Sequence, residues 1–369
     1  MLDSRETATG TIDRVEVETY KVPTELPESD GTLQWDHTDI SIVTVQAQGK
    51  QGMGYTFAGE SAAALIHDVL GEVVKGMDPM SPQAAYMEMW RRTRNMGRPG
   101  ISSMAISAVD CALWDLKARL LDQPLASLLG RVRDAAPVYG SGGFTSYTDH
   151  QLSRQLEGWA REGIGAVKMK IGRDPARDSE RLRAARKAIG ADTKLYVDAN
   201  GAYNPREALA QAEMLADYDV RWFEEPVSSD NLSGMRFVRE HVGPRINVTA
   251  GEYGYDLFYF GEMLNAGAVD VLQADITRCG GVTCFMQVAA LCQVHNVSLS
   301  AHTAPAQHAH VACAAVPFTE IEYFHDHVRI EEIFFEGLPK LVRGELRPDL
   351  SRPGNGLEVR RKDAAKFAA

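Results

Sequence analysis

The segment at 166–172, AVKMKIG, alternates in the manner of a β-strand, and both of its lysines lie on one face. The other face is apolar and is predicted to be buried. Lysine is depleted in strands, and a buried ammonium group is costly unless neighbouring groups compensate its charge. Lys168 and Lys170 therefore indicate a functional site at this strand.

Seven further short apolar runs have a similar character, and helical patterns separate them at intervals of about 20 to 30 residues. The eight predicted strands are 137–140, 166–172, 194–200, 220–226, 247–252, 270–275, 297–302 and 320–324. This alternation predicts a parallel β/α barrel. A doubly wound open sheet is the competing fold, but GSGGF at 140–144 is a weak candidate for its phosphate loop and has no matching acidic residue about 20 residues later. The barrel is therefore favoured.

The first 130 residues have a different pattern, which predicts an α+β domain. Segments 11–20 and 39–47 alternate like antiparallel strands, and segments 81–95 and 101–121 have helical spacing. The stretch at 24–38 is rich in Gly, Pro and polar residues. We expect it to form a loop of roughly 14 residues that acts as a lid over the barrel.

Composition excludes several classes of function. The 369 residues are 44% apolar and 24% charged with a net charge of −11, and no basic run is present, so binding to nucleic acid or to an anionic membrane is not expected. Five cysteines without a CxxC pair predict reduced, buried thiols. The first ten residues lack an apolar signal-peptide core and no run of 18 apolar residues occurs, which predicts a cytoplasmic protein.

Ionisable residues stand at the carboxyl ends of seven consecutive predicted strands, where a parallel barrel builds its active site. They are Lys168 and Lys170, Asp198, Glu224 and Glu225, Glu252, Asp275, His302, and Glu322. A single acidic residue at such a place is most often a helix N-cap. The repetition over seven strands predicts an active site instead.

Three carboxylates on adjacent strands, from Asp198, Glu224 and Glu252, are predicted to converge and bind a hard divalent ion, Mg²⁺ or alternatively Mn²⁺. Strand alternation sends only one of Glu224 and Glu225 inward, and the pattern does not decide which. The alternative explanation for these carboxylates is a set of separate ion pairs with neighbouring lysines.

Two acid/base groups are predicted beside this metal. Burial, mutual proximity and a nearby dication each lower a lysine pKa, so one of Lys168 and Lys170 would act as a general base, unless both extend to solvent. Asp275 and His302 lie one β/α unit apart, and their pairing would give a second acid/base, although a lone histidine is as often a core residue. Four other histidines are assigned to helix and loop positions without a catalytic role: His308, His310, His325 and His327.

The motifs VKMKIG, VDAN, FEEP, TAGE, QADITRCGGVT and LSAH, in this order, resemble the mandelate racemase subgroup of the enolase superfamily. The run AISAVDCALWDLKARLLDQPLASLLG is similar to the end of that family's capping domain. The resemblance implies an α+β capping domain over residues 1–130, a modified (β/α)₇β barrel over 131–330, and a tail over 331–369 that returns to the capping domain. It also implies a homo-oligomer.

Carried onto this sequence, the resemblance assigns roles to the strand-end residues. It implies Mg²⁺ ligation by Asp198, Glu252 and the first glutamate of FEEP, Glu224. It implies that Lys170 is the base on one face of the substrate and that Lys168 lowers its pKa and contacts the substrate carboxylate.

The remaining assignments from the resemblance concern the other face of the substrate. His302, paired with Asp275, would act there, and Glu322 would hydrogen-bond the substrate carboxylate or enolate. Asn200 would support the metal site from outside. Arg278 stands where some members have a lysine, which argues against the muconate-lactonising branch.

The implied reaction is Mg²⁺-dependent abstraction of the proton α to a carboxylate, which gives an enediolate. Dehydration of an acid sugar, an aldonate or aldarate, to a 2-keto-3-deoxy acid is favoured because the predicted lid is polar, and Tyr139 near the first strand would add a hydrogen bond. The polar lid residues are Glu25, Glu28, Asp30, Trp35, Asp36 and His37. The alternatives are a racemase or epimerase of a 2-hydroxy acid and a metal-binding barrel that acts as a binding protein. A divalent-metal hydrolase would require a second metal or a histidine-rich ligand set, and the sequence supplies neither.

Overall fold

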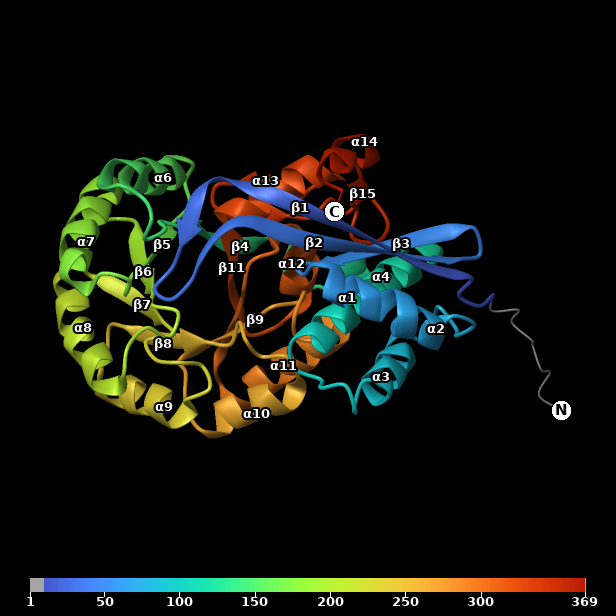
Figure 1. Ribbon diagram of the computed structural model, residues 1–369, viewed down its shortest axis with the longest axis horizontal. Coiled ribbons are helices and arrows are strands. Elements are labelled where there is room, and N and C mark those ends of the chain that lie inside the picture. The colour runs from blue at the N-terminus through green and yellow to red at the C-terminus, as the bar shows by residue number, and fades with distance from the viewer. Residues whose placement is uncertain (1–9, 369) are drawn as a thin grey trace.

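The computed structural model describes residues 10–368. Residues 1–9, on which much of the prediction about a signal peptide rests, lie outside this range. The described chain forms an α/β barrel and an amino-terminal α+β domain, here called the cap (Figure 1). None of the helices in residues 10–368 combines the length and apolar character needed to cross a membrane. All five cysteines are buried and free, as predicted.

The cap is an antiparallel sheet in the order β1-β2-β3 with helices packed on one side. Its strands are β1 (Arg14–Ser29), β2 (Gln34–Ala47) and β3 (Lys50–Thr56). Its helices are α1 (Glu60–Leu65), the π-helical turn η1 (Ile66–Leu70), α2 (Gly71–Val74), α3 (Pro82–Arg92), α4 (Ile101–Leu120) and α5 (Leu125–Leu128).

Helix α4 packs against both the cap sheet and the barrel, because it is apolar on nearly every face. One side lies so close to β3 that a Cβ atom at Gly54 would come within 2.4 Å of the Ala108 carbonyl oxygen. On the other side, the buried Asp110 accepts hydrogen bonds from the backbone N–H of Thr283 at 2.9 Å and from its hydroxyl at 2.6 Å. The indole N–H of Trp114 donates to the same hydroxyl at 2.9 Å.

The predicted barrel is confirmed. Eight parallel strands alternate with seven helices, and pairing of β11 with β4 closes the barrel. The strands are β4 (Ala136–Gly142), β5 (Ala166–Lys170), β6 (Lys194–Asp198), β7 (Val220–Glu224), β8 (Asn247–Ala250), β9 (Val271–Ala274), β10 (Ser298–Ala301) and β11 (Phe318–Phe324). The helices between them are α6 (Asp149–Arg161), α7 (Pro175–Ile189), α8 (Pro205–Asp217), α9 (Leu232–His241), α10 (Leu257–Asn265), α11 (Gly281–His295) and α12 (Pro305–Ala314).

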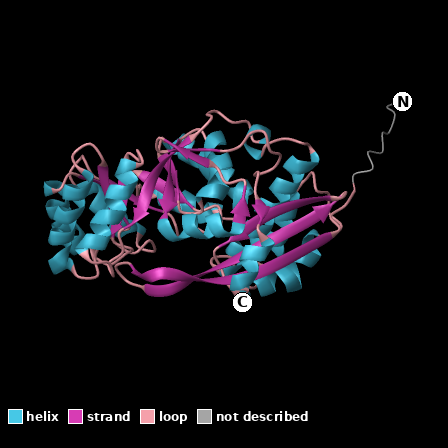
Figure 2. Ribbon diagram, turned by 90° about the horizontal axis from the view of Figure 1, so that it is seen from above, coloured by secondary structure: helices cyan, strands magenta, loops and turns pink. Residues whose placement is uncertain are grey.

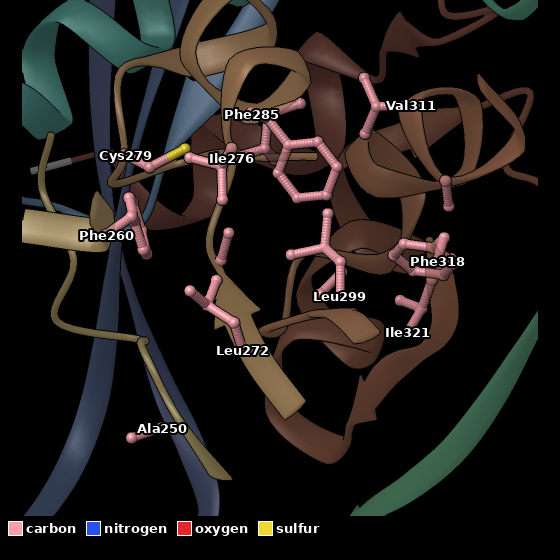
Figure 3. Close-up of a cluster of buried hydrophobic side chains, with 14 of the residues drawn as sticks. Ala250, Phe260, Leu272, Ile276, Cys279, Phe285, Leu299, Val311, Phe318 and Ile321 are labelled. Atoms are coloured by element: carbon pink, nitrogen blue, oxygen red, sulfur yellow. The ribbon is translucent and has the colours of Figure 1, made fainter. Parts of the chain in front are cut away.

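Two apolar layers support the barrel. The layer between strands and helices includes Leu272, Leu299 and Phe285, which converge in Figure 3. Inside the barrel, aromatic rings fill the space below the mouth, with Tyr196 and Trp222 stacked at a centroid distance of 5.0 Å. Because this interior is packed, the functional side chains have to lie at the mouth.

The predicted lid loop at 24–38 is wrong in its secondary structure. β1 and β2 continue as one long ribbon, with Glu28 paired to Trp35, and only residues 30–33 form the turn. The prolines and polar residues that suggested a loop lie at an irregularity in the register between Pro23 and Glu28, where the ladder is interrupted. The ribbon runs from the cap along the barrel (Figures 1 and 2). Its turn packs on the mouth, where a Cβ at Gly31 would meet the Ala199 carbonyl oxygen at 2.5 Å.

After the barrel, the chain returns to the cap. Its elements are α13 (His325–Phe334), β12 (Phe335–Glu336), β13 (Lys340–Val342), β14 (Glu345–Arg347), β15 (Glu358–Val359), α14 (Arg361–Ala364) and the 3₁₀ turn η2 (Ala365–Phe367). Strand β14 pairs antiparallel with β4 at the outside of the barrel. The backbone N–H of Asn355 donates to the buried carboxylate of Asp115 in α4 at 2.6 Å, which fixes this return.

Candidate active site

The barrel register brings the predicted residues together at the mouth. Lys170 pairs with Asp198 across β5 and β6, and Asp198 pairs with Glu224 across β6 and β7. Paired residues on neighbouring strands project to the same face, so these three side chains point into the same space. The two predicted lysines and all three predicted metal ligands are buried there.

Lys168 and Lys170 are each in direct contact with carboxylates. The Lys168 Nζ atom lies 2.7 Å from both carboxylate oxygens of Glu224 and 2.8 Å from Glu322 Oε1. The Lys170 Nζ atom donates to Asp198 Oδ2 at 2.5 Å. Neither lysine extends to solvent, which excludes that explanation of the pair.

These contacts correct the expectation of a lowered lysine pKa. Burial lowers the pKa of Lys170, but the surrounding carboxylates, led by Asp198, together raise it by more, so the net pKa lies above its ordinary value. The same balance, with Glu224 and Glu322 as partners, raises the pKa of Lys168. The prediction is therefore wrong for the protein groups alone, because sequence could not show that each ammonium touches a carboxylate.

The three carboxylates form one cluster. Asp198, Glu224 and Glu252 each offer an oxygen, and these oxygens all lie within 4.8 Å of one another. Glu224 rather than Glu225 belongs to this cluster. The Glu225 side chain instead lines a second cavity beside the cluster, which is described below. Glu252 Oε2 is buried without a hydrogen-bond partner in the described residues, although His302 Nε2 lies 3.3 Å away. Oxygen ligands with an unsatisfied lone pair fit a hard dication such as Mg²⁺.

His302 and Asp275 form the predicted pair. The Nδ1 atom of His302 lies 2.8 Å from Asp275 Oδ2, so Nδ1 is the donor and Nε2 faces the carboxylate cluster. Burial lowers the pKa of His302, but the nearby carboxylates, led by Glu252 and Glu322, raise it to about 9. Thr277 holds the other oxygen of Asp275 through its backbone N–H and its hydroxyl, each at 2.7 Å.

Arg278 and Asn200 lie at the edge of this cluster. Arg278 contacts two carboxylates of the site. Its Nη1 atom lies 3.6 Å from Glu252 Oε1, and its Nε atom lies 3.4 Å from Asp275 Oδ2. The backbone N–H of Asn200 donates to Asp198 Oδ1 at 2.8 Å. Arg278 therefore touches Glu252 and the partner of His302, and Asn200 touches Asp198.

A cavity of about 500 Å³ opens above the carboxylates and is here called the catalytic cavity. Lys170, Glu252 and His302 line its barrel side, and Trp35 and His37 from the β1–β2 ribbon line its cap side. Asp30, Trp35 and His37 of the predicted lid therefore line the cavity, whereas Glu25, Glu28 and Asp36 do not. The indole N–H of Trp35 donates to the buried Glu28 at 2.9 Å, which fixes the ring over the cavity.

The expectation that Tyr139 hydrogen-bonds the substrate is corrected by its position. It is fully buried inside the barrel and does not line the catalytic cavity. Its hydroxyl accepts a hydrogen bond from Gln273 at 3.2 Å, and the Lys168 ammonium lies 5.2 Å from its ring centroid. Strand β4 points this ring inward below the mouth, so Tyr139 supports Lys168 instead of binding substrate.

The four remaining histidines occupy three kinds of position. His308 and His310 are buried core residues, and burial lowers the pKa of each to about 4. His325 lies 3.4 Å from Glu25, outside the catalytic cavity. His327 was assigned no role from its position, but it lines the catalytic cavity beside Thr303 and Phe324.

Sequence reasoning missed the aromatic wall of the cavity. Phe57, directly after β3, stacks on His327 in α13 with ring centroids 3.4 Å apart and an interplanar angle of 14°. Both rings line the catalytic cavity. They come from segments 270 residues apart, so no local pattern could have signalled the pair.

Comparisons with known proteins agree over both parts of the chain. Residues 14–130 match the family described as mandelate racemase / muconate lactonizing enzyme, N-terminal domain. Residues 151–364 match the family described as enolase C-terminal domain-like.

Two curated relatives illustrate the range of reactions. A 3,6-anhydro-alpha-L-galactonate cycloisomerase from Streptomyces coelicolor is 32% identical, with 94% of this chain and 96% of the relative covered. An L-talarate/galactarate dehydratase from Salmonella typhimurium is 28% identical, with 86% of this chain and 83% of the relative covered. A more distant relative from Enterococcus faecalis is a hydrophobic dipeptide epimerase.

Solved structures give the same result. A mandelate racemase/muconate lactonizing enzyme-like protein from Rubrobacter xylanophilus is 48% identical with a TM-score of 0.95, covering 97% of this chain and 100% of that one. A racemase from Streptomyces coelicolor with bound magnesium is 29% identical with a TM-score of 0.91, again covering 97% and 100%. The chain therefore belongs to the mandelate racemase/muconate lactonizing enzyme family of the enolase superfamily, in which its curated relatives are dehydratases, cycloisomerases and epimerases.

Proposed function

We propose that this protein is a Mg²⁺-dependent enzyme that removes the proton α to the carboxylate of an acid sugar and then eliminates the oxygen at C3. One observation carries the proposal. Lys170 and His302 line the same cavity and contact different members of the carboxylate cluster, Asp198 and Glu252. Two acid/base groups arranged in this way suit a reaction that removes a proton from one carbon and donates one to the oxygen on the next carbon.

The metal would be held by Asp198, Glu224 and Glu252. Mg²⁺ bound there supplies positive charge for the substrate carboxylate and for the enediolate that follows. Lys168 would donate a hydrogen bond to the same charge from its position between Glu322 and the metal ligand Glu224. Burial raises the pKa of Glu322, but Lys168 and His302 lower it to about 2, so Glu322 is a carboxylate that accepts from the Lys168 ammonium and would hold it in place.

Lys170 would be the base that removes the C2 proton. It must be neutral to do so, and its contact with Asp198 opposes this in the protein alone. Carboxylates that share their charge with a dication stabilise a neighbouring ammonium less, while burial continues to favour the neutral amine. The lysine pKa is therefore expected to fall when the metal ligands are occupied.

His302 would be the acid. With Asp275 holding Nδ1, the protonated imidazole presents its Nε2–H to the cavity. The electron pair from the C2–H bond forms the C2–C3 double bond, the C3–O bond breaks, and the leaving oxygen takes the Nε2 proton. The resulting enol becomes a 2-keto-3-deoxy acid.

The nature of the C3 oxygen decides the type of reaction. If it is a free hydroxyl, water leaves and the enzyme is a dehydratase. If it belongs to an anhydro ring, the same bond cleavage opens the ring and no atoms are lost, so the reaction is an isomerisation. We favour this elimination because the activities of two relatives, a dehydratase and a 3,6-anhydro-alpha-L-galactonate cycloisomerase, both fit it.

The test is proton NMR in D₂O with protein, Mg²⁺ and a pool of aldonic, anhydro-aldonic and aldaric acids. Elimination predicts loss of one acid and a new C3 methylene signal that carries deuterium. The variant Lys170→Met is expected to abolish C2 exchange, whereas His302→Asn is expected to retain exchange and lose elimination.

Racemisation or epimerisation is the second candidate, because His302 could instead return a proton to C2 from the other face. A new diastereomer with C2 exchange and no keto acid would establish it. Binding of Mg²⁺ without exchange in any acid would refute both reactions and favour a binding protein.

A further inference from the structure

A second cavity of about 640 Å³, here called the outer cavity, adjoins the catalytic cavity. Asn200 and Tyr253 line both, so the two spaces are neighbours at the mouth of the barrel. The cap contributes Thr32 and Pro99 to the outer wall. The shared wall makes the outer cavity a candidate place for the far end of a substrate bound at the metal ligands.

The two cavities differ in charge. In the catalytic cavity, Lys170 and Arg278 both already contact carboxylates. The residues that line the outer cavity within the described chain include no lysine, arginine or histidine. Three of its lining residues are acidic: Glu225, Asp230 and Asp256.

Glu225 gives the outer cavity an unsatisfied polar group. Its backbone has a φ of +39°, and its side chain, 1% exposed, lines the outer cavity instead of joining the metal ligands. Its Oε1 atom has no hydrogen-bond partner in the described residues, and neither has Oδ1 of the adjacent Asn200. Unpaired buried polar atoms are unfavourable, so these two atoms indicate a ligand that can hydrogen-bond to them, as the hydroxyls of a sugar chain do.

We propose that the substrate carries a single carboxylate, which binds at the metal end, and that its hydroxylated end lies in the outer cavity. The protein would thus act on aldonates, open-chain or anhydro, and discriminate against aldarates. This inference rests on the proposed function and narrows its substrate class.

The physical reason is desolvation without compensation. A second carboxylate at the far end would lose part of its hydration, and no cation of the outer cavity would replace it. It would instead face Asp230 and Asp256. Repulsion between neighbouring like charges near a protein surface is worth about a tenfold change in binding.

The experiment compares acids that differ only at C6. The pairs are D-gluconate with D-glucarate and D-galactonate with galactarate, and kcat/KM is measured by keto-acid formation and by C2 exchange in D₂O. We expect the aldonate of any pair that reacts to be favoured by tenfold or more. Equal or faster turnover of the aldarate would overturn the inference while leaving the proposed function intact. Absence of exchange in every aldonate and aldarate, anhydro forms included, would overturn both.

A charge-reversal variant tests the location. Asp230→Lys places a cation in the outer cavity, and Asp230 is chosen because Asp256 caps helix α10 through the Tyr259 N–H. The aldonate-to-aldarate ratio is expected to fall about tenfold, and Asp230→Asn should give a smaller change in the same direction. Asp217→Lys, on the exposed surface of α8, is the matched control. An unchanged ratio in both Asp230 variants would refute the placement of the distal end.

Discussion

Replacement of His310 by glutamine is predicted to make the protein's stability less sensitive to acid. His310 in α12 is 1% exposed, and its two ring nitrogens join three parts of the molecule. Nδ1 accepts the backbone N–H of Ala126 in α5 at 3.2 Å, and Nε2–H donates to the Asn355 carbonyl at 3.0 Å. The bond from Ala126 requires the neutral ring, because a protonated Nδ1 cannot accept it, and burial lowers the pKa of His310 to about 4.

The magnitude follows from proton linkage. An unfolded histidine has a pKa of about 6.5, so between about pH 6.5 and 4 the unfolded chain holds a proton that the folded protein lacks. The contribution to stability is fully present above pH 6.5 and is lost as the pH falls towards 4. At about 1.4 kcal/mol per pH unit, the loss amounts to about 2 kcal/mol between pH 7.5 and pH 5.

The assay is urea unfolding followed by tryptophan fluorescence at several pH values from 7.5 to 5. His310→Gln should be less stable than the wild type by about 1–3 kcal/mol at pH 7.5, because the Ala126 N–H loses its acceptor. The difference should shrink by about 2 kcal/mol at pH 5, since glutamine does not titrate. The exposed His150→Gln serves as the control. A wild-type to His310→Gln difference that stays constant over this pH range would refute the reasoning.

Three further predictions concern the site and its support. Glu252→Gln should weaken Mg²⁺ binding at least about tenfold in titration calorimetry, because a charged ligand is lost, whereas exposed Glu180→Gln should not; equal affinities would contradict the metal site. Asp275→Asn should lower kcat by about 100-fold or more with little change in KM, since the imidazole loses its fixed tautomer; an unchanged kcat would exclude the pair from catalysis. Gly354→Ala should destabilise the protein by about 2 kcal/mol or more in urea unfolding, because φ is +72° and the new Cβ would lie 2.0 Å from Asp115 Oδ1; an unchanged midpoint would contradict this packing.

Much of the site could be predicted from sequence because barrel topology converts order along the chain into position in space. Once the strands are parallel and adjacent, residues such as Asp198 and Glu224 at their carboxyl ends must be neighbours, as their register shows. The pairing of His302 with Asp275 could be predicted in the same way, because residues one β/α unit apart lie at the ends of neighbouring strands. The homo-oligomer implied by the resemblance stays a prediction.

Other features depend on contacts that no local pattern contains. The sequence predicts a loop where the β1–β2 ribbon forms, because strand pairing such as Glu28 with Trp35 is decided between segments and their composition alone favours turns. The pKa of Lys170 was misjudged for the same reason. Its direction depends on a 2.5 Å contact with Asp198, and only the folded structure fixes that distance.

The reaction is easier to predict from the sequence than the identity of the substrate, because different parts of the molecule would determine them. The groups that would move protons, Lys170 and His302, lie at barrel strand ends whose geometry the fold enforces. The groups that would contact the rest of the substrate come from the ribbon, from the segment directly after β3 and from loops beside the outer cavity, each placed by long-range packing. A change in Trp35 or Asp230 would therefore alter which acid is accepted without altering the register that holds the acid and the base. The single-carboxylate inference consequently depends on the charges lining the outer cavity, whereas the proposed elimination depends on the barrel alone.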